Sequence, residues 1–244
     1  MQARRATKTR AVSLHILVYN RRDFVVAAAH AGVVESHHLA ASLGTGRYLG
    51  WIDSDDILEA TALAECVAVL DERPEVGMVY TDHVNIDPIG RVMGLDQRCR
   101  VPYSPMRLLI DFMTFHFRLI RREAFVRAGG IDRTVMVAED YDLCLRLSEV
   151  TEIVHLQKPL YRYRIHPHAI SQETRLEQIR GSEEAVRRAI RRRGLEEHID
   201  LNVELRATFA LIPKTAVGAR NLAASAAADR AAARYGPAAM GGHP

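Results

Sequence analysis

The chain has 244 residues, of which 48% are hydrophobic and 26% are charged, and these proportions are ordinary for a globular protein. Its net charge of +3 is small for this length and argues against nucleic-acid binding. Cys66, Cys99 and Cys144 have no C-x-x-C spacing, which argues against a zinc knuckle and favours a reducing, cytoplasmic compartment. No apolar stretch reaches the length of a membrane span, and the basic first ten residues lack the apolar region of a signal peptide.

The N-terminal part of the chain predicts a strand followed by helical segments. Residues 12–18 are rich in β-branched side chains and alternate in part between polar and apolar, as a strand does. Residues 24–34 have a helical pattern. The adjacent His37 and His38 would point in different directions from either a strand or a helix, so we expect surface or packing roles for them.

Three carboxylates follow a short apolar run in the segment W-I-D-S-D-D. Residues 48–52 have the length and composition of a buried strand, and Asp53, Asp55 and Asp56 come directly after it. Ligands of open α/β sheets bind at the carboxyl ends of strands, where Mg²⁺ or Mn²⁺ would neutralise clustered carboxylates. The alternative is that the acids begin a helix at residues 58–70. Both hold if Asp56 caps that helix while Asp53 and Asp55 face a cation.

The middle of the chain predicts further strands and short helices. Residues 76–80 have the pattern of a second buried strand that ends at residues 81–82, and a D-P-I-G turn at residues 87–90 predicts a hairpin. Residues 115–120 are strand-like, and residues 121–126 begin a short helix that ends at a Gly-Gly pair.

Residues 138–147 predict an amphipathic helix whose first turn is acidic. Leu143 and Leu147 lie on one face of this helix, and acids in the first turn are favoured by the helix dipole. A plain helix N-terminus explains this pattern without a function. The functional hypothesis is that a carboxylate of Glu139 or Asp140 lies beside the cation site as a general base.

Two short strands are predicted next, at residues 153–156 and 159–166. In the second, Arg162 and Arg164 alternate with aromatic and apolar residues, which gives one basic and one apolar face. These arginines could bind diphosphate oxygens, and His166 at the strand end could be a third metal ligand. The alternative is that these side chains are simply solvated.

The C-terminal part predicts one long helix and a tail. Residues 174–193 have a helical pattern with i, i+4 Glu–Arg pairs, and one end is strongly basic. This basic end is either a solvated face or a contact with an anionic membrane surface. Its arginines are Arg187, Arg188, Arg191, Arg192 and Arg193. Residues 223–244 are Ala-rich and low in complexity, so we expect a domain at residues 1–172, a helical extension at 173–222 and this tail.

In this order, the motifs resemble those of family 2 glycosyltransferases, which have the GT-A fold. They are W-I-D-S-D-D at residues 51–56, A-G-G-I-D at 128–132, A-E-D-Y-D-L-C-L-R-L at 138–147 and Y-R-Y-R-I-H at 161–166. The opening strand also ends in the Tyr-Asn turn of that family, here Tyr19 and Asn20, and residues 115–125 resemble its Phe-Arg segment before the double glycine. The resemblance covers most of residues 12–172.

The resemblance implies an α/β fold: a GT-A-like, Rossmann-like, mostly parallel sheet with helices on both faces and a helical C-terminal appendage. It also implies transfer of a sugar from a nucleotide-sugar to an acceptor hydroxyl, with inversion. The D-x-D motif of the family binds Mg²⁺ or Mn²⁺, and Asp53 and Asp55 match it by position; with His166, suggested above by its place at the strand end, they are the expected metal ligands. The residues expected to contact the donor are Tyr19, Asn20 and Asp53, together with Arg162 and Arg164 from the basic face of the strand. Asp140 matches the family's base, and Glu139 is the competing candidate.

One segment typical of the family is not found in the sequence. Members usually carry a second strand, ending in an Asp-Asp-Gly-Ser-like turn that helps to hold the nucleotide base, before the D-x-D strand. A partner chain could supply this segment, so an oligomer is one alternative, and a non-catalytic GT-A-like structural or interaction module is another. No motif identifies the acceptor, which could be a glycan, a lipid-linked sugar or a small molecule.

Overall fold

The computed structural model describes residues 12–17, 33–135, 137–166 and 175–204, and for residues 12–17 it describes the backbone. Two compact units are distinguished, Met1–Leu201 and Asn202–Pro244, and only residues 202–204 of the second are described. The predicted Tyr19–Asn20 turn, almost all of the predicted helix at residues 24–34 and the Ala-rich tail lie outside the described residues.

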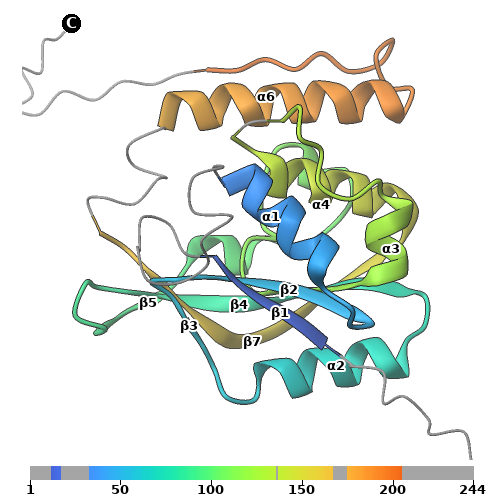
Figure 1. The fold of residues 1–244 in the computed structure, drawn as a ribbon. Helices are drawn as coiled ribbons and strands as arrows, with labels where there is room; N and C mark the ends of the chain where they lie inside the picture. Colours follow the sequence, from blue (N-terminus) through green and yellow to red (C-terminus); the bar gives the residue numbers. More distant parts are fainter. Residues whose placement is uncertain (1–11, 18–32, 136, 167–174, 205–244) are drawn as a thin grey trace, which may run out of the picture. The chain divides into compact units, whose positions relative to one another are not determined.

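The described part of the first unit contains both strands and helices, interspersed along the chain (Figure 1). The elements are β1 (Val12–Leu17), α1 (Val33–Leu43), β2 (Tyr48–Asp53), β3 (Ile57–Leu58), α2 (Ala62–Glu72), β4 (Val76–Ile86), β5 (Val92–Leu95), β6 (Arg118–Arg121), α3 (Arg122–Arg127), α4 (Glu139–Val150), β7 (Glu152–Arg164) and α6 (Arg175–Arg192). The predicted opening strand, D-x-D strand, hairpin, Arg-Arg helix, acidic helix and long C-terminal helix are all confirmed.

The seven strands found in the described residues form one mixed sheet in the order β1-β2-β6-β4-β7-β3, with β5 paired to β4. The prediction of an α/β sheet flanked by helices is confirmed, but the expectation of a mostly parallel sheet is wrong. Only the pairs β1–β2 and β4–β7 are parallel, and the other described pairs are antiparallel. The error has a physical reason: a strand buried on both faces has the same hydrophobic pattern in either direction.

Helices cover both faces of this sheet, and alternation along the strands assigns each side chain to a face (Figure 1). On β4, Met78 and Tyr80 pack into the core under α3, α4 and α6, whereas Val79 packs into the core under α2. Helix α6 contributes Val186 and Ile190 to the first of these cores. The long C-terminal helix therefore shares the core of the first unit.

Strands β4 and β7 are longer than the sequence predicts. Strand β4 continues past residues 81–82 to Ile86, and the two strands predicted at residues 153–156 and 159–166 are one strand, β7. The two strands pair in parallel, and their register shifts where Asp82 of β4 lies opposite Pro159 of β7. Irregular pairing of this kind admits a proline, which lacks the N–H that a regular ladder needs.

The prediction that Asp56 caps a helix beginning near residue 58 is wrong. Residues Ile57–Leu58 form the short strand β3, which pairs with β7 at Arg162 and Tyr161. Helix α2 begins only at Ala62, with Thr61 in the N-cap position. Because Ile57–Leu58 pair with β7, Asp56 lies in the turn between β2 and β3 and does not cap α2.

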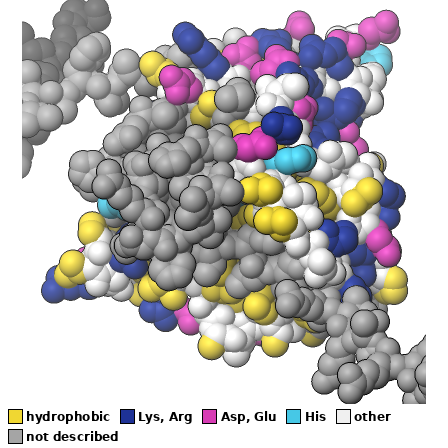
Figure 2. Space-filling view, viewed as in Figure 1, with side chains coloured by type: hydrophobic (Ala, Val, Ile, Leu, Met, Phe, Trp, Pro, Cys, Tyr) yellow, Lys and Arg dark blue, Asp and Glu magenta, His cyan; other side chains and the backbone are white. Residues whose placement is uncertain are grey.

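The five arginines at the basic end of α6 and directly after it form ion pairs with neighbouring carboxylates. Arg187 and Arg188 pair with acids one turn earlier on the helix, and Arg192 and Arg193 both reach Glu149 of α4. Figure 2 shows basic and acidic side chains interspersed over this part of the surface. These pairs favour the solvated-face interpretation of the basic run. Among the described helices, none is long and apolar enough to cross a membrane.

Gly77 of β4 lies where a larger side chain has no room. A Cβ atom at this position would be 2.5 Å from Cγ2 of Thr151 and 2.6 Å from Cβ of Ala124. Since both distances are too short for a real Cβ contact, the neighbours would have to shift, and we expect Gly77→Ala to lower the free energy of unfolding by about 1–3 kcal/mol. Urea unfolding monitored by circular dichroism measures this. The exposed Glu75→Ala should change it by less than about 0.5 kcal/mol, and an equal effect of the two variants would contradict the packing argument.

Candidate functional site

Residues 53–56, here called the acid loop, lie at the carboxyl end of β2. Strand β1 runs parallel to β2 and ends opposite Asp53, so two parallel strands end together at this edge of the sheet. A turn follows, closed by a hydrogen bond from the Asp56 N–H to the Asp53 carbonyl oxygen at 3.2 Å. Strand β6 runs antiparallel to β2, which brings His116, just before β6, beside the acid loop.

Two residues of β7 hold the acid loop in place. The Tyr161 hydroxyl donates to Asp56 Oδ2 at 2.7 Å and accepts from the Asp53 N–H at 3.3 Å. The Arg164 N–H donates to Asp56 Oδ1 at 2.7 Å, and Arg164 Nε donates to the Asp55 carbonyl oxygen at 2.6 Å. The loop therefore has a conformation fixed by neighbours outside it.

The two arginines predicted to contact a diphosphate both have protein partners. Besides Asp55, the Arg164 guanidinium donates to the carbonyl oxygens of Asp87 and Pro88, each at 3.1 Å. Arg162 forms an ion pair with Glu59. Arg164 thus ties the acid loop to the tip of the β4–β5 hairpin, and a donor would have to compete with these partners for either guanidinium.

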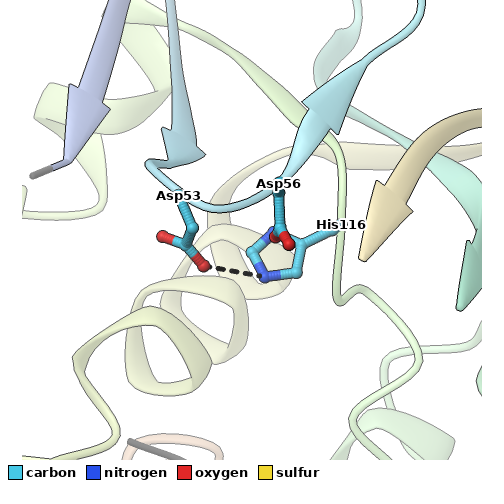
Figure 3. Close-up of side chains that lie close together, drawn as sticks. All are labelled: Asp53, Asp56 and His116. Carbon is cyan, nitrogen blue, oxygen red and sulfur yellow. Dashed lines mark ion pairs between the residues drawn. The ribbon is translucent and has the colours of Figure 1, made fainter. Parts of the chain in front are cut away.

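Two carboxylate–imidazole pairs flank the acid loop. On the more exposed side, His166 Nε2 lies 2.8 Å from Asp55 Oδ2, so two of the three predicted metal ligands are adjacent. On the inner side, His116 Nε2 lies 3.7 Å from Asp53 Oδ2. Asp53, Asp56 and His116 each offer a ligand atom, and these three atoms lie within 4.8 Å of one another (Figure 3). The structure therefore groups Asp53 with Asp56 and His116.

The acid loop concentrates negative charge in a partly buried place. Burial raises the pKa of the Asp53 carboxyl to about 6, although the nearby His37 acts in the opposite direction. Burial also raises the pKa of Asp56 to about 7, against the hydrogen bonds from Arg164 and Tyr161. Because 41% of the Asp53 side chain is exposed, a cation from solvent can reach this carboxylate. Binding one would stabilise both charged carboxylates.

The buried imidazole of His116 is chemically suited to ligate a metal. Burial, followed by the positive charge of Arg118, lowers its pKa well below the usual value, so the ring is neutral at neutral pH. A neutral imidazole keeps a lone pair on one nitrogen, which is the form that binds metal ions.

The first turn of α4 places two carboxylates in different surroundings. Glu139 is 6% exposed, and its Oε1 lies 3.0 Å from Nδ1 of His37 on α1. Asp140 keeps 30% of its side chain exposed and accepts a hydrogen bond from Arg118 Nη2 at 3.1 Å. Both Asp140 and Arg118 are among the charges that act on Asp53. Asp140 therefore combines access to solvent with proximity to the acid loop.

Sequence reasoning missed several residues of this site. His116 lies in a run that has a strand-like pattern, and Tyr161 lies on the apolar side of the Y-R-Y-R alternation. His37 packs edge-on against Trp51, with ring centroids 5.7 Å apart, which agrees with the predicted packing role. It also pairs with Glu139, which was not predicted. Only the order of strands β2, β6 and β7 brings these side chains together. Tyr19 and Asn20 lie outside the described residues.

No protein-family model matches the chain, but several curated proteins are similar to it. Chondroitin synthase and hyaluronan synthase of Pasteurella multocida are each 29% identical over 147 residues, covering 60% of this chain and 15% of the relative. Chondroitin synthase of Escherichia coli is 30% identical over 141 residues, covering 58% of this chain and 20% of the relative. The chain thus spans a fifth or less of these relatives. The similarity confirms the predicted resemblance to family 2 glycosyltransferases.

Solved structures of S. aureus TarS also match part of the chain. The structure of TarS 1–349 has a TM-score of 0.45 at 16% identity and covers 70% of this chain and 56% of that one. The same protein in complex with UDP has a TM-score of 0.43 at 18% identity and the same coverage.

Proposed function

We propose, from its resemblance to family 2 glycosyltransferases, that the chain transfers a sugar from a nucleotide-sugar to an acceptor hydroxyl with inversion, using a divalent cation. Its relatives are named as synthases of chondroitin and hyaluronan, which are sugar polymers. The observation that supports the proposal is a short segment that contacts both groups: His116 lies 3.7 Å from Asp53, and Arg118, two residues later, donates to Asp140 at 3.1 Å. We therefore propose that a cation site and a general base lie on either side of this segment.

The donor atoms at the acid loop fit Mn²⁺ or Mg²⁺. Carboxylate oxygens from Asp53, Asp55 and Asp56 are the hard ligands that these cations take, and His116 and His166 add imidazole nitrogens. When bound, the cation would supply charge neutralisation for the departing nucleoside diphosphate. The tie from Tyr161 and Arg164 to Asp56 holds the loop ready before the donor arrives.

Asp140 is the residue that we assign as the general base. Its carboxylate would take the proton from the acceptor hydroxyl as that oxygen attacks the anomeric carbon and the bond to the diphosphate breaks. One displacement gives one inversion. Arg118 holds the carboxylate from one side, and the exposed part of the side chain is left for the acceptor. Glu139, in contrast, is buried against His37.

A second candidate function is a GT-A-like module that binds a partner without catalysis. Between β1 and β2, the described residues contain helix α1 and no strand. The segment that helps to hold the nucleotide base in the family is thus not seen in the described part of the chain. Nucleotide binding separates the two candidates.

The proposed function is tested by binding of a nucleoside diphosphate. A ligand that binds only the folded protein raises its stability, by about 2.7 kcal/mol at a hundred times the dissociation constant. We expect Mn²⁺ with UDP, GDP or another nucleoside diphosphate to raise the melting temperature of the wild type, and Asp53→Ala to abolish that rise. Asp200→Ala, which removes the same charge at an exposed site, should keep it. If no nucleoside diphosphate stabilises the wild type, the non-catalytic module is the better description.

A further inference from the structure

We propose that the hairpin formed by β4 and β5 is a membrane-contact surface. Its turn, residues 87–91, inserts into the interface of an anionic lipid bilayer, and Arg91 and Arg100 lie among the lipid headgroups. The hairpin is at one end of the sheet, to the left in Figure 1. The contact is independent of the proposed sugar transfer.

Large apolar side chains of the hairpin are exposed to solvent. The exposed fraction is 72% for Ile89 in the turn, and it is 58% for Val92, 63% for Met93 and 42% for Leu95 on β5. Pro88, next to Ile89, is also exposed. Single exposed apolar side chains are common, but a group of them in one hairpin is typical of a contact surface.

The backbone of the turn suits an apolar environment, because its N–H groups are hydrogen-bonded within the protein. The Asp87 N–H donates to the Arg91 carbonyl oxygen, and the Gly90 N–H donates to the Asp87 carbonyl oxygen, each at 2.9 Å. The N–H groups of Ile89 and Arg91 donate to Asp87 Oδ1 at 3.0 and 2.8 Å, and Pro88 has no N–H. The carbonyl oxygens of Asp87 and Pro88 accept from a guanidinium of β7. Since unpaired backbone groups are costly in lipid, this turn can enter a bilayer interface at low cost.

The charges around these apolar side chains complement an anionic surface. Arg91 and Arg100 are exposed, and neither has an ion-pair partner in the described part of the chain. The two carboxylates of this stretch, Asp87 and Asp96, accept hydrogen bonds from protein N–H groups. The basic end of α6 differs, because its arginines are paired with carboxylates. Unpaired arginines beside exposed apolar side chains have the composition of segments that bind anionic membranes.

A second copy of the chain is the other occupant to be considered, because β5 lies at an edge of the sheet. The pairing of β5 with β4 is short and irregular. Val92 lies opposite Ile86 and Gly94 lies opposite Asn85, so Met93 is an extra residue in β5. Short edge strands and bulges discourage pairing between the sheets of two molecules. A lipid surface requires no strand register, and the hairpin therefore favours lipid.

The experiment is sedimentation of the full chain with vesicles of phosphatidylcholine alone or of phosphatidylcholine mixed equally with phosphatidylglycerol. We expect binding to the mixed vesicles that falls with increasing salt. Ile89→Asn should weaken this binding about 10-fold, the scale for withdrawing one apolar side chain. Arg91→Gln should weaken it about 5-fold. The matched controls are Leu43→Asn, at a position that is 70% exposed on α1, and Arg187→Gln on α6, and both should bind like the wild type.

Insertion of the turn is measured directly by a fluorophore at residue 89. Cys66, Cys99 and Cys144 are buried, so the exposed thiol of Ile89→Cys can be labelled selectively with an environment-sensitive dye. We expect the emission of this dye to shift to shorter wavelength with the mixed vesicles. The same dye in Leu43→Cys should not shift.

Three results would overturn the proposal. The first is an absence of binding to the mixed vesicles. The second is binding that is lost in Arg187→Gln and kept in Ile89→Asn and Arg91→Gln, which would place the membrane contact on α6. The third is a dimer, detected by sedimentation velocity, that Ile89→Asn dissociates and that does not bind vesicles, which would make a second copy the occupant. Failure of the proposed function is seen separately, in the absence of stabilisation by any nucleoside diphosphate.

Discussion

If the chain has the proposed sugar-transfer activity, Asp140→Asn is expected to reduce it by a factor of about 10² or more while leaving the affinity for Mn²⁺ and nucleoside diphosphate nearly unchanged. The substitution removes the proton acceptor and keeps the shape. Asp140 accepts from Arg118 at Oδ2 and from the Tyr141 N–H at Oδ1, and Asn keeps an oxygen for one of these two hydrogen bonds. The fold around α4 should persist, because the buried side chains Leu143, Leu145 and Leu147 of this helix are unchanged. Single-turnover transfer measured beside isothermal titration with nucleoside diphosphate separates the two quantities.

Glu139→Gln is the matched control for this prediction. The buried Glu139 carboxylate lies against His37, so its replacement should change stability more than the chemical step. Transfer that survives in Asp140→Asn and is lost in Glu139→Gln would show that the neighbouring carboxylate is the base. An equal loss of donor affinity in Asp140→Asn would mean that Asp140 contacts the donor rather than the acceptor.

The sequence was sufficient to predict those elements whose pattern depends on residues close to one another in the chain. The apolar run before Asp53, the D-P-I-G hairpin and the acidic start of α4 all appear where they were predicted. Local pattern did not determine the direction of β6 or the continuity of β7 across Pro159, because both depend on which strand lies alongside. Pairing with distant strands is the information that a local pattern lacks.

The same distinction applies to the candidate site. Asp55 and His166 were predicted to be ligands of the same cation, and in the structure their side chains lie 2.8 Å apart. His116 was not found, because it becomes a neighbour of Asp53 only through the antiparallel pairing of β6 with β2. A histidine directly before a strand is a weak signal without that pairing. Tyr161 was assigned to an apolar face, although its hydroxyl is the group that contacts the acid loop.

Arg146→Met is expected to lower the free energy of unfolding by about 3–5 kcal/mol, the scale for breaking a buried ion pair. Arg146 Nε donates to Asp142 Oδ2 at 2.8 Å one turn earlier on α4, and Asp142 is 1% exposed. The same guanidinium donates to the carbonyl oxygens of Ala128 and Gly130, at the turn that follows α3. Removing it leaves a buried carboxylate with its closest remaining cation, Arg192 in the described part of the chain, at 4.0 Å.

Arg187→Met provides the control, because it breaks an ion pair of the same i, i+4 geometry at an exposed position. The side chains of Arg187 and Glu183 are 44% and 32% exposed, and exposed pairs of this kind contribute about 0.2–0.5 kcal/mol. Denaturant unfolding of both variants measures the difference. Both substitutions remove one positive charge and replace the same kind of side chain on a helix, so they differ mainly in burial. A similar small loss of unfolding free energy in both variants would show that the buried carboxylate of Asp142 is stabilised by something other than Arg146. A large loss in Arg146→Met alone would show that this guanidinium strengthens the contact between α4 and the turn after α3, beside the apolar packing of Ala128 and Ile131 in the same core.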